Sequence, residues 1–304
     1  MCRVIGDVAP IPEPIEKKGR LVKTPESAIF PIERIFHPSD FTQASEVAFA
    51  HALKLGLIAK AELSIMHMTS DATEAAWLNF PGVRTTLERW GLLPKGSMRA
   101  DVAQTGVEIQ KVLTLGRDPA DAVLHYLAEE PTDLVVLATH QHDGITRWWH
   151  KAVAEPIARK SKTMTLFIPH GVNGFVALED GRVTLQHVLL PVDRIPAPHD
   201  AIDIAADLTR ALGVADVAFT LLYVGAEGDQ PMVQIPQQDG WTWDTVVRQG
   251  NVVEQILDVA TTCAADLIVM TTQGHHGFLD ALRGSTSERI VRGAHCPILA
   301  VPAA

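Results

Sequence analysis

The sequence has few of the residues that mark specialised classes of protein. Its 304 residues include only three cysteines, at positions 2, 263 and 296. Three thiols cannot build a disulfide framework, and the opening residues lack the apolar run of a secretory signal. No apolar stretch is long enough to cross a bilayer, because runs such as 134–137 are bounded by polar residues. We therefore predict a cytoplasmic protein with free thiols and no membrane span.

Positive charge is also scarce. The chain has 26 Lys and Arg against 36 Asp and Glu, a formal net charge of -10. This balance argues against a broad electrostatic grip on nucleic acid or on an anionic membrane. With 47% hydrophobic residues, the chain has ample material for packed cores. Its length exceeds that of most single cores, which favours two domains.

An internal repeat organises the chain. Residues 133–139 resemble residues 266–272, and the match continues without a gap to Pro169 and Pro302, at an offset of 133 residues. A second match joins residues 35–40 to residues 188–193 at an offset of 153. The change of offset predicts an insertion in the first half, and residues 71–105 are the candidate.

Strand and helix patterns alternate within each half, which indicates a parallel sheet covered on both faces. We expect strands near 34–38, 62–68, 109–115, 133–138 and 164–168, and again near 187–192, 217–224, 244–249, 266–271 and 297–301. Helices are expected near 43–56, 118–129, 151–160, 199–212, 251–263 and 286–293. The predicted fold is α/β, with two tandem doubly wound, Rossmann-like domains at 29–173 and 174–304. An arm at 1–28 precedes them, and a hairpin over 175–185 links them.

One glycine pattern suggests ligand chemistry. Gly274 and Gly277 follow an apolar strand, and Gly284 and Ser285 then lead into a helix. Glycines let the backbone approach a ligand closely, and the free amides at a helix start favour phosphate. On spacing alone, an anion cradle and a set of ordinary loop and cap residues are equally good interpretations.

The order of these pieces resembles the universal stress protein family. That family has two glycines three residues apart, then Gly-Ser or Gly-Thr, a helix and a final apolar strand, and it opens with a strand ending in Pro-x-Asp. Here the opening is matched at 38–40 and 191–193, and the last strand at 297–301. The second glycine gap is three residues shorter than usual. The resemblance covers residues 30–302.

The resemblance implies that the second half binds an adenine nucleotide, with ATP as the first candidate and Mg²⁺ as a companion. Adenine and ribose would lie near Pro191, Val192, Asp193 and Val224. The ribose and phosphates would lie near Gly274, His275, Gly277, Gly284, Ser285, Thr286 and Ser287. In the first half the glycine and hydroxyl positions become Gln141, Gly144, Lys151, Ala152 and Val153, although Asp40 and Met68 persist. We expect that half to be a scaffold.

The histidines leave a further interpretation open. His140, His142 and His150 gather in the first half, and His275, His276 and His295 in the second, but neither group has the spacing of a zinc motif. No P-loop or nucleophile elbow is present, so we predict no dedicated catalysis and at most slow ATP hydrolysis.

Three functions follow from these patterns. The first is a nucleotide-responsive stress regulator or scaffold, which could self-associate or bind a protein partner. The second is an interaction protein with vestigial sites that uses residues 71–105 to contact its partner. The third is a metal-dependent hydrolase built on the histidines.

Overall fold

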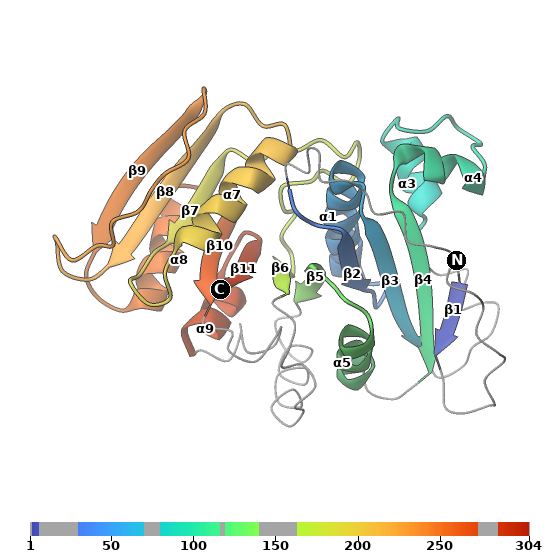
Figure 1. The fold of residues 1–304 in the computed structure, drawn as a ribbon, viewed down its shortest axis with the longest axis horizontal. Coiled ribbons are helices and arrows are strands. Elements are labelled where there is room, and N and C mark those ends of the chain that lie inside the picture. Colours follow the sequence, from blue (N-terminus) through green and yellow to red (C-terminus); the bar gives the residue numbers. More distant parts are fainter. Residues whose placement is uncertain are drawn as a thin grey trace.

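The computed structural model describes residues 2–5, 30–69, 80–115, 119–139, 163–272 and 285–303, and it confirms the predicted α/β fold (Figure 1). The elements of the first half are β2 (Arg34–Pro38), α1 (Gln43–Ala59), β3 (Glu62–Thr69), β4 (Glu108–Leu115), α5 (Pro119–Glu129), β5 (Leu134–Thr139) and β6 (Met164–Pro169). Those of the second half are β7 (His187–Pro191), α7 (His199–Ala211), β8 (Val217–Val224), β9 (Trp241–Arg248), α8 (Val252–Thr262), β10 (Leu267–Thr272), α9 (Ser285–Gly293) and β11 (Ile298–Pro302). The helix expected at 151–160 lies outside the described residues.

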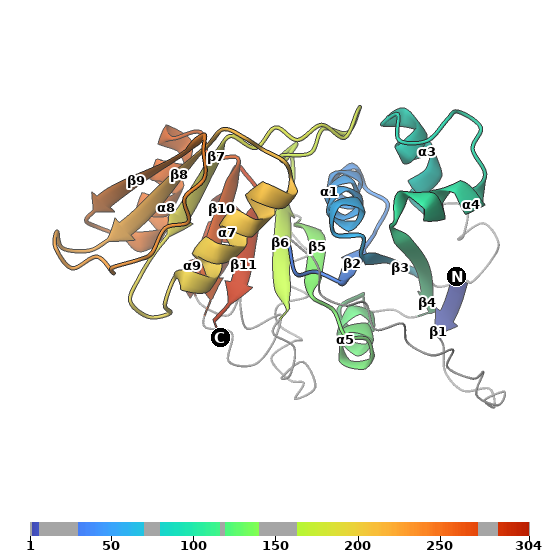
Figure 2. The same ribbon diagram turned by 45° about the horizontal axis from the view of Figure 1, so that its top comes forward.

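The described strands, including the short first strand β1 (Cys2–Ile5), form one sheet in the order β1-β4-β3-β2-β5-β6-β11-β10-β7-β8-β9. Each half therefore places its first strand between its second and fourth, which is the doubly wound arrangement. Strands within each half pair in parallel, whereas β6 and β11 pair antiparallel. Figure 2 shows these two strands side by side at the centre, with one half on either side. The halves are thus an intramolecular pair joined through their last strands.

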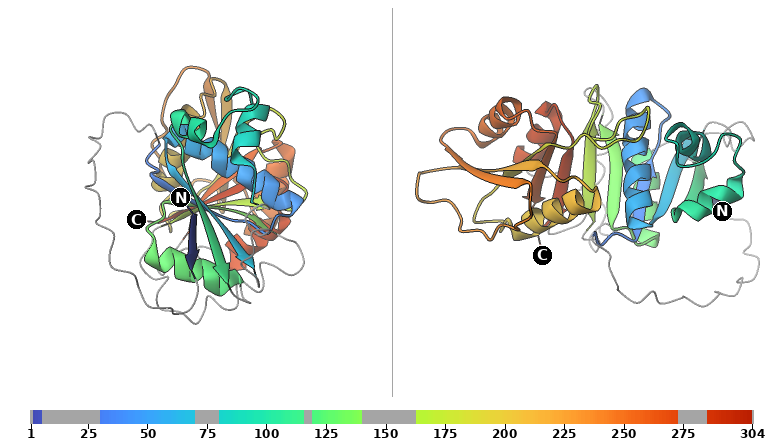
Figure 3. Two further views of the ribbon diagram at one scale, coloured as in Figure 1. Left: turned by 90° about the vertical axis from the view of Figure 1, so that its right-hand side faces the viewer. Right: turned by 90° about the horizontal axis from the view of Figure 1, so that it is seen from above.

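Two apolar layers sandwich this sheet. One layer gathers buried residues of α1, α7 and the segment 175–185. The other gathers residues of α5, α8 and α9. Each layer runs through both halves, and Figure 3 shows α1 and α5 on opposite sides of the strands. Because every central strand is buried on both faces, these strands are continuous apolar runs, as in β5 and β10.

The predicted hairpin between the halves is present as a bridge between Val176 and Val183, and its turn closes at Gly181. His51, on α1, fixes this hairpin to the first half. Its Nε2 accepts hydrogen bonds from the backbone N–H groups of Phe175 (3.0 Å) and Val176 (3.2 Å), while its Nδ1 donates to the Val47 carbonyl (2.8 Å). This set requires a neutral ring, and burial lowers the pKa of His51 from 6.5 to about 4.

The described part of the predicted insertion contains two short helices, α3 (Val83–Arg89) and α4 (Arg99–Val102), followed by a 3-10 turn at Ala103–Thr105. The insertion also contacts the hairpin, because Trp90 Nε1 donates to the Leu178 carbonyl at 3.1 Å. The ring of Trp90 lies so close to Gly181 that a Cβ there would stand 2.5 Å from it. The insertion therefore packs on the segment that joins the two halves.

Two elements differ from the sequence prediction. Residues Cys2–Ile5, within the predicted arm, form strand β1 and pair in parallel with Lys111–Thr114 on the outer edge of β4. Strand β9 begins at Trp241, three residues earlier than expected. Its early start follows from packing, because Trp243 stacks on Phe219 with ring centroids 4.2 Å apart.

A matched pair of aspartates fixes the start of each half. One carboxylate oxygen of Asp133 accepts hydrogen bonds from the backbone N–H groups of Glu33 (2.8 Å) and Arg34 (2.9 Å). In the second half, Asp266 does the same for Gln186 (2.7 Å) and His187 (3.0 Å). Each aspartate thus ties its half's fourth strand to the beginning of its first.

Candidate functional site

The candidate site lies at the carboxyl ends of β7 and β8. Pro191 of β7 pairs with Leu222 of β8, and the Val192 N–H donates to the Leu222 carbonyl at 2.9 Å. This register sets Asp193 beside the end of β8, where Val224 is the last residue. Val192 is buried, Val224 is half-buried and Asp193 is exposed. The structure therefore brings together the four residues expected around the adenine and ribose.

The strand order reverses at this place. Strand β7 lies between β10 and β8. The helices that follow β7 and β10, α7 and α9, therefore lie on opposite faces of the sheet. Such a reversal opens a crevice at the carboxyl ends, where parallel α/β sheets bind ligands.

The phosphate part of the predicted site is described only in its last residues. Gly274, His275, Gly277 and Gly284 lie outside the described residues. Helix α9 begins at Ser285, and Thr286 and Ser287 follow in its first turn. The structure therefore places the start of this helix but not the glycines that precede it.

Polar contacts order the loop that follows β7. One Asp193 carboxylate oxygen accepts a hydrogen bond from the backbone N–H of Arg194 at 2.7 Å. The Arg194 guanidinium in turn lies 3.7 Å from the carboxylate of Asp229, in the long loop between β8 and β9. Both loops thus border the end of β7, and they leave the Asp193 side chain exposed to solvent.

The corresponding place in the first half is arranged differently. The Asp40 carboxylate accepts hydrogen bonds from the Thr42 backbone N–H (3.0 Å) and hydroxyl (2.7 Å), at the start of α1. Phe41 adopts a left-handed backbone conformation with φ of 63°. Its ring stacks on His67 at 3.8 Å and meets the edge of Phe80 at 5.7 Å.

We call Phe41, His67 and Phe80 the aromatic cluster. It is extended by the Lys111 ammonium, which lies 5.2 Å from the centre of the Phe80 ring, and it is held by a 2.9 Å hydrogen bond from His67 Nδ1 to the Ser39 carbonyl. No sequence pattern predicted this cluster. The one available signal was Phe41, an aromatic residue directly after the Pro-x-Asp motif. The glycine-equivalent positions, Gln141, Gly144, Lys151, Ala152 and Val153, lie outside the described residues.

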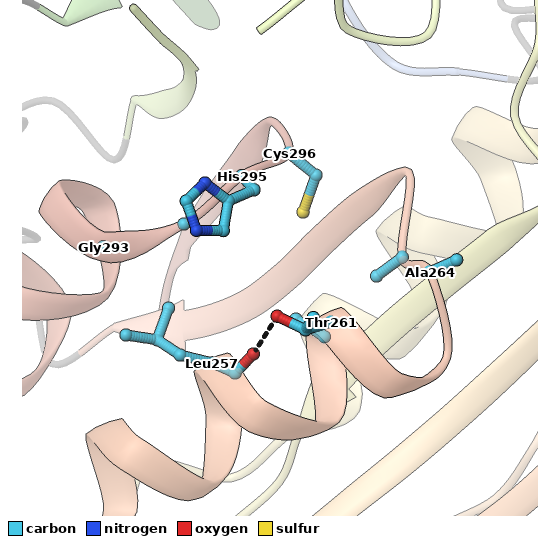
Figure 4. Close-up of a pocket in the computed structure, with 9 residues that line it drawn as sticks. Leu257, Thr261, Ala264, Gly293, His295 and Cys296 are labelled. Atoms are coloured by element: carbon cyan, nitrogen blue, oxygen red, sulfur yellow. Dashed lines mark hydrogen bonds between the residues drawn. The ribbon is translucent and has the colours of Figure 1, made fainter.

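The histidines give no metal centre within the described part of the chain, where no three His, Cys, Asp or Glu side chains gather in a way that could hold an ion. His140, His142, His150, His275 and His276 lie outside it. His295 is exposed and borders a pocket of about 300 Å³ between α8 and α9 (Figure 4). The residues that line this pocket lie just before β10 and β11, at the amino ends of these strands. The pocket is therefore at the end of the sheet opposite to Asp193.

The pocket beside α8 is poor in reactive groups. Its lining is mainly small and apolar, and burial raises the pKa of its thiol, Cys296, to about 12. Such a thiol stays protonated and is a weak nucleophile. A second hollow, of about 720 Å³, lies between α3, α4 and the start of β4. Neither hollow touches the carboxyl ends of β7 and β8.

No helix in the described ranges is long and apolar enough to cross a bilayer.

Comparison with known proteins identifies a family and a fold. The model of the universal stress protein family matches residues 31–169 and 235–302. A universal stress protein of Methanocaldococcus jannaschii is 35% identical over 77 residues, which cover 25% of this chain and 45% of that protein. A universal stress protein of Synechocystis is 27% identical over 139 residues, covering 40% of this chain and 88% of that protein.

Among solved structures, a universal stress protein from Archaeoglobus fulgidus superposes with a TM-score of 0.54 at 15% identity, covering 90% of this chain and 100% of that one. A functionally unknown protein from Pseudomonas aeruginosa superposes with a TM-score of 0.58 at 12% identity, covering 91% and 94%. At these identities the likeness concerns the fold.

Proposed function

Because the chain belongs to the universal stress protein family, we propose that its second half binds an adenine nucleotide, with ATP as the first candidate and with or without Mg²⁺. The first half is the scaffold of this binding unit. Bound nucleotide then biases the surface that the protein offers to partners in a stress response, acting as a ligand that shifts a conformational equilibrium.

The observation that carries the proposal is the contrast between Asp193 and Asp40. Asp193 lies exposed beside Val224 at the reversal of strand order, where a ribose hydroxyl could reach its carboxylate. Asp40 stands at the equivalent point and is also exposed, but one of its carboxylate oxygens accepts two hydrogen bonds from Thr42, and the aromatic cluster lies next to it. In the second half the aspartate is bound only by the N–H of the next residue, whereas in the first half it holds Thr42, the residue that caps α1.

The experiment combines nucleotide content with a matched pair of variants. Protein purified without added ligand is denatured and its released small molecules are identified. Stripped protein is then titrated calorimetrically with ATP, ADP and AMP. We expect about one equivalent per chain, weakened at least about tenfold by Asp193→Ala, which corresponds to about 1.4 kcal/mol. Asp40→Ala should leave the affinity unchanged.

A substitution at Gly284 tests the phosphate side in the same assay. Gly284→Val should abolish binding without loss of folding if the glycine lets the backbone approach the phosphates. Absence of bound nucleotide and of binding heat would instead favour the interaction protein with vestigial sites. Equal losses in the Asp40 and Asp193 variants would contradict the assignment to the second half.

A further inference from the structure

The two outer edges of the sheet, formed by the β4 side and by β9, differ in whether a further strand among the described residues covers them. On the first half, β1 covers the outer edge of β4 by pairing with Lys111–Thr114. The pairing registers of β2, β3 and β4 and of β7, β8 and β9 place Val112 and Val246 at equivalent points. The covered stretch of β4 therefore corresponds to residues 245–248 of β9. No strand among the described residues pairs with the outer edge of β9 (Figure 1).

The hydrogen bonds of β9 show which backbone groups point outward. Gly225 N–H donates to the Arg248 carbonyl (2.8 Å), and Val217 N–H donates to the Gly240 carbonyl (3.3 Å), both on the β8 side. Backbone direction alternates along a strand, so the even-numbered residues of β9 face β8. The N–H and C=O groups of Trp243, Thr245 and Val247 therefore face away from the sheet. The outward carbonyl of Val247 accepts a 3.4 Å hydrogen bond from Arg248 Nη1, and the Arg248 side chain must give up this contact when a second chain pairs with the edge.

We propose that this edge pairs antiparallel with the same edge of a second copy of the chain, about a twofold axis at Val246. In this register Thr245 and Val247 of one copy exchange hydrogen bonds with Val247 and Thr245 of the other. Asp244 and Arg248 then lie directly opposite each other, twice by symmetry. Both are exposed, and they fall at non-hydrogen-bonded positions, where opposed side chains come closest.

The charges of Asp244 and Arg248 favour this pairing register over registers shifted along the strand. A twofold axis at Asp244 would oppose the two Asp244 carboxylates. An axis at Thr245 would set Asp244 against Val246, and one at Val247 would set Arg248 against Val246. Only the axis at Val246 matches both charged residues with a partner of opposite sign. A long bare edge ordinarily invites pairing with another chain, and the two charges restrict that pairing to one arrangement.

Charge reversal provides the decisive test. Wild-type protein should show a concentration-dependent monomer–dimer equilibrium in sedimentation velocity. Asp244→Lys opposes Lys to Arg, and Arg248→Glu opposes Glu to Asp, so each variant alone should dimerise at least roughly tenfold more weakly. An equimolar mixture should regain dimers, because the introduced lysine of one variant then faces the introduced glutamate of the other. The remaining pair in that mixed dimer is the native one, Arg248 against Asp244.

A cysteine placed on the axis tests the register. In Val246→Cys the two introduced thiols would face each other across a non-hydrogen-bonded pair, with Cα atoms about 4.5 Å apart, close enough for a disulfide. Mild oxidation should therefore give a covalent dimer. Thr242→Cys is the matched control, because its two copies would lie about 27 Å apart. Wild-type protein controls for the native cysteines.

Three results would overturn the proposal. They are a wild-type chain that stays monomeric at every concentration, single charge variants that dimerise as well as wild type, and a mixture that gains nothing over its components. Thermal unfolding of each variant should match wild type, since Asp244 and Arg248 are exposed.

Discussion

The two halves share one strand order, and each has an aspartate, Asp133 or Asp266, that binds the start of its first strand. They differ in the residue that follows the Pro-x-Asp motif. In the first half this residue is Phe41, whose ring stacks on His67 and helps to build the aromatic cluster. In the second half it is Arg194, whose guanidinium reaches Asp229, and the motif aspartates Asp40 and Asp193 are exposed in both halves. The residue that follows the motif thus decides whether aromatic or charged side chains lie beside this strand end.

The halves also differ in buried polar groups. His37, on β2, is fully buried and its Nδ1 donates to the Val136 carbonyl at 2.9 Å. Among the described residues its Nε2 has no hydrogen-bond partner. The pairing of Pro38 with Met66 and of Pro191 with Leu222 places Leu190, also fully buried, at the equivalent position of the second half. The first half therefore carries a titratable group in its core where the second has an apolar one.

The largest expected effect on the stability of the protein comes from the two buried histidines of the first half, His37 and His51. Burial lowers the pKa values of His37 and His51 from 6.5 to about 4. Between these pH values the unfolded chain binds protons that the folded chain does not, so the free energy of unfolding falls as pH falls from 6.5 to about 4. Each histidine contributes about 3 kcal/mol to this loss. Denaturant titrations across the window measure it.

His37→Leu copies the second half and sharpens the test. We expect about half of the histidine-dependent loss to disappear, with a change within about 1.5 kcal/mol at neutral pH, since size and burial are retained. An unchanged pH slope in this variant would show that His37 does not supply its share of the acid sensitivity.

A smaller effect should be equal in the two halves. Asp133→Ala and Asp266→Ala each remove an acceptor of two backbone N–H groups. We expect each to lower the free energy of unfolding by about 2 kcal/mol, and the corresponding Asn variants, which keep one acceptor oxygen, to lose less. Chemical denaturation of the four variants measures this. A clear loss in one half only would mean that the capping roles are not equivalent.

A further prediction, with a smaller change in stability, concerns the contact between the insertion and the hairpin. Trp90→Phe removes the hydrogen bond to the Leu178 carbonyl and should cost about 1 kcal/mol. Trp243→Phe is the control, because among the described residues Trp243 Nε1 has no partner and the replacement ring can still stack on Phe219. Equal costs would assign the Trp90 effect to packing rather than to the hydrogen bond.

The repeat made the fold predictable, because the same order of strand and helix patterns occurs twice in the sequence and each copy supports the other. Apolar runs such as β5 and β10 were placed within a residue of their observed ends. Strand β1 was missed because four residues beside a Pro- and Lys-rich stretch carry no periodicity of their own, and they become a strand only through pairing with β4.

The site was predictable to the extent that it depends on chain order. Asp193 follows β7 and Val224 ends the neighbouring strand β8, so the family pattern places them together. The aromatic cluster depends on the left-handed backbone at Phe41 and on Phe80, which lies far along the chain, and no local pattern encodes that meeting. Asp133 and Asp266 begin the matched segments, but their hydrogen bonds span 99 and 79 residues to Arg34 and His187, which sequence spacing alone does not reveal.

The antiparallel pairing of β6 with β11 joins two similar halves inside one chain. When identical chains pair, every substitution appears in both partners, and a change that fills one binding pocket fills the other. Here each half has its own stretch of sequence, so a substitution at Phe41 leaves Arg194 unchanged. Because the two halves are covalently linked, their residues can differ at equivalent positions. A dimer of identical chains cannot acquire such differences.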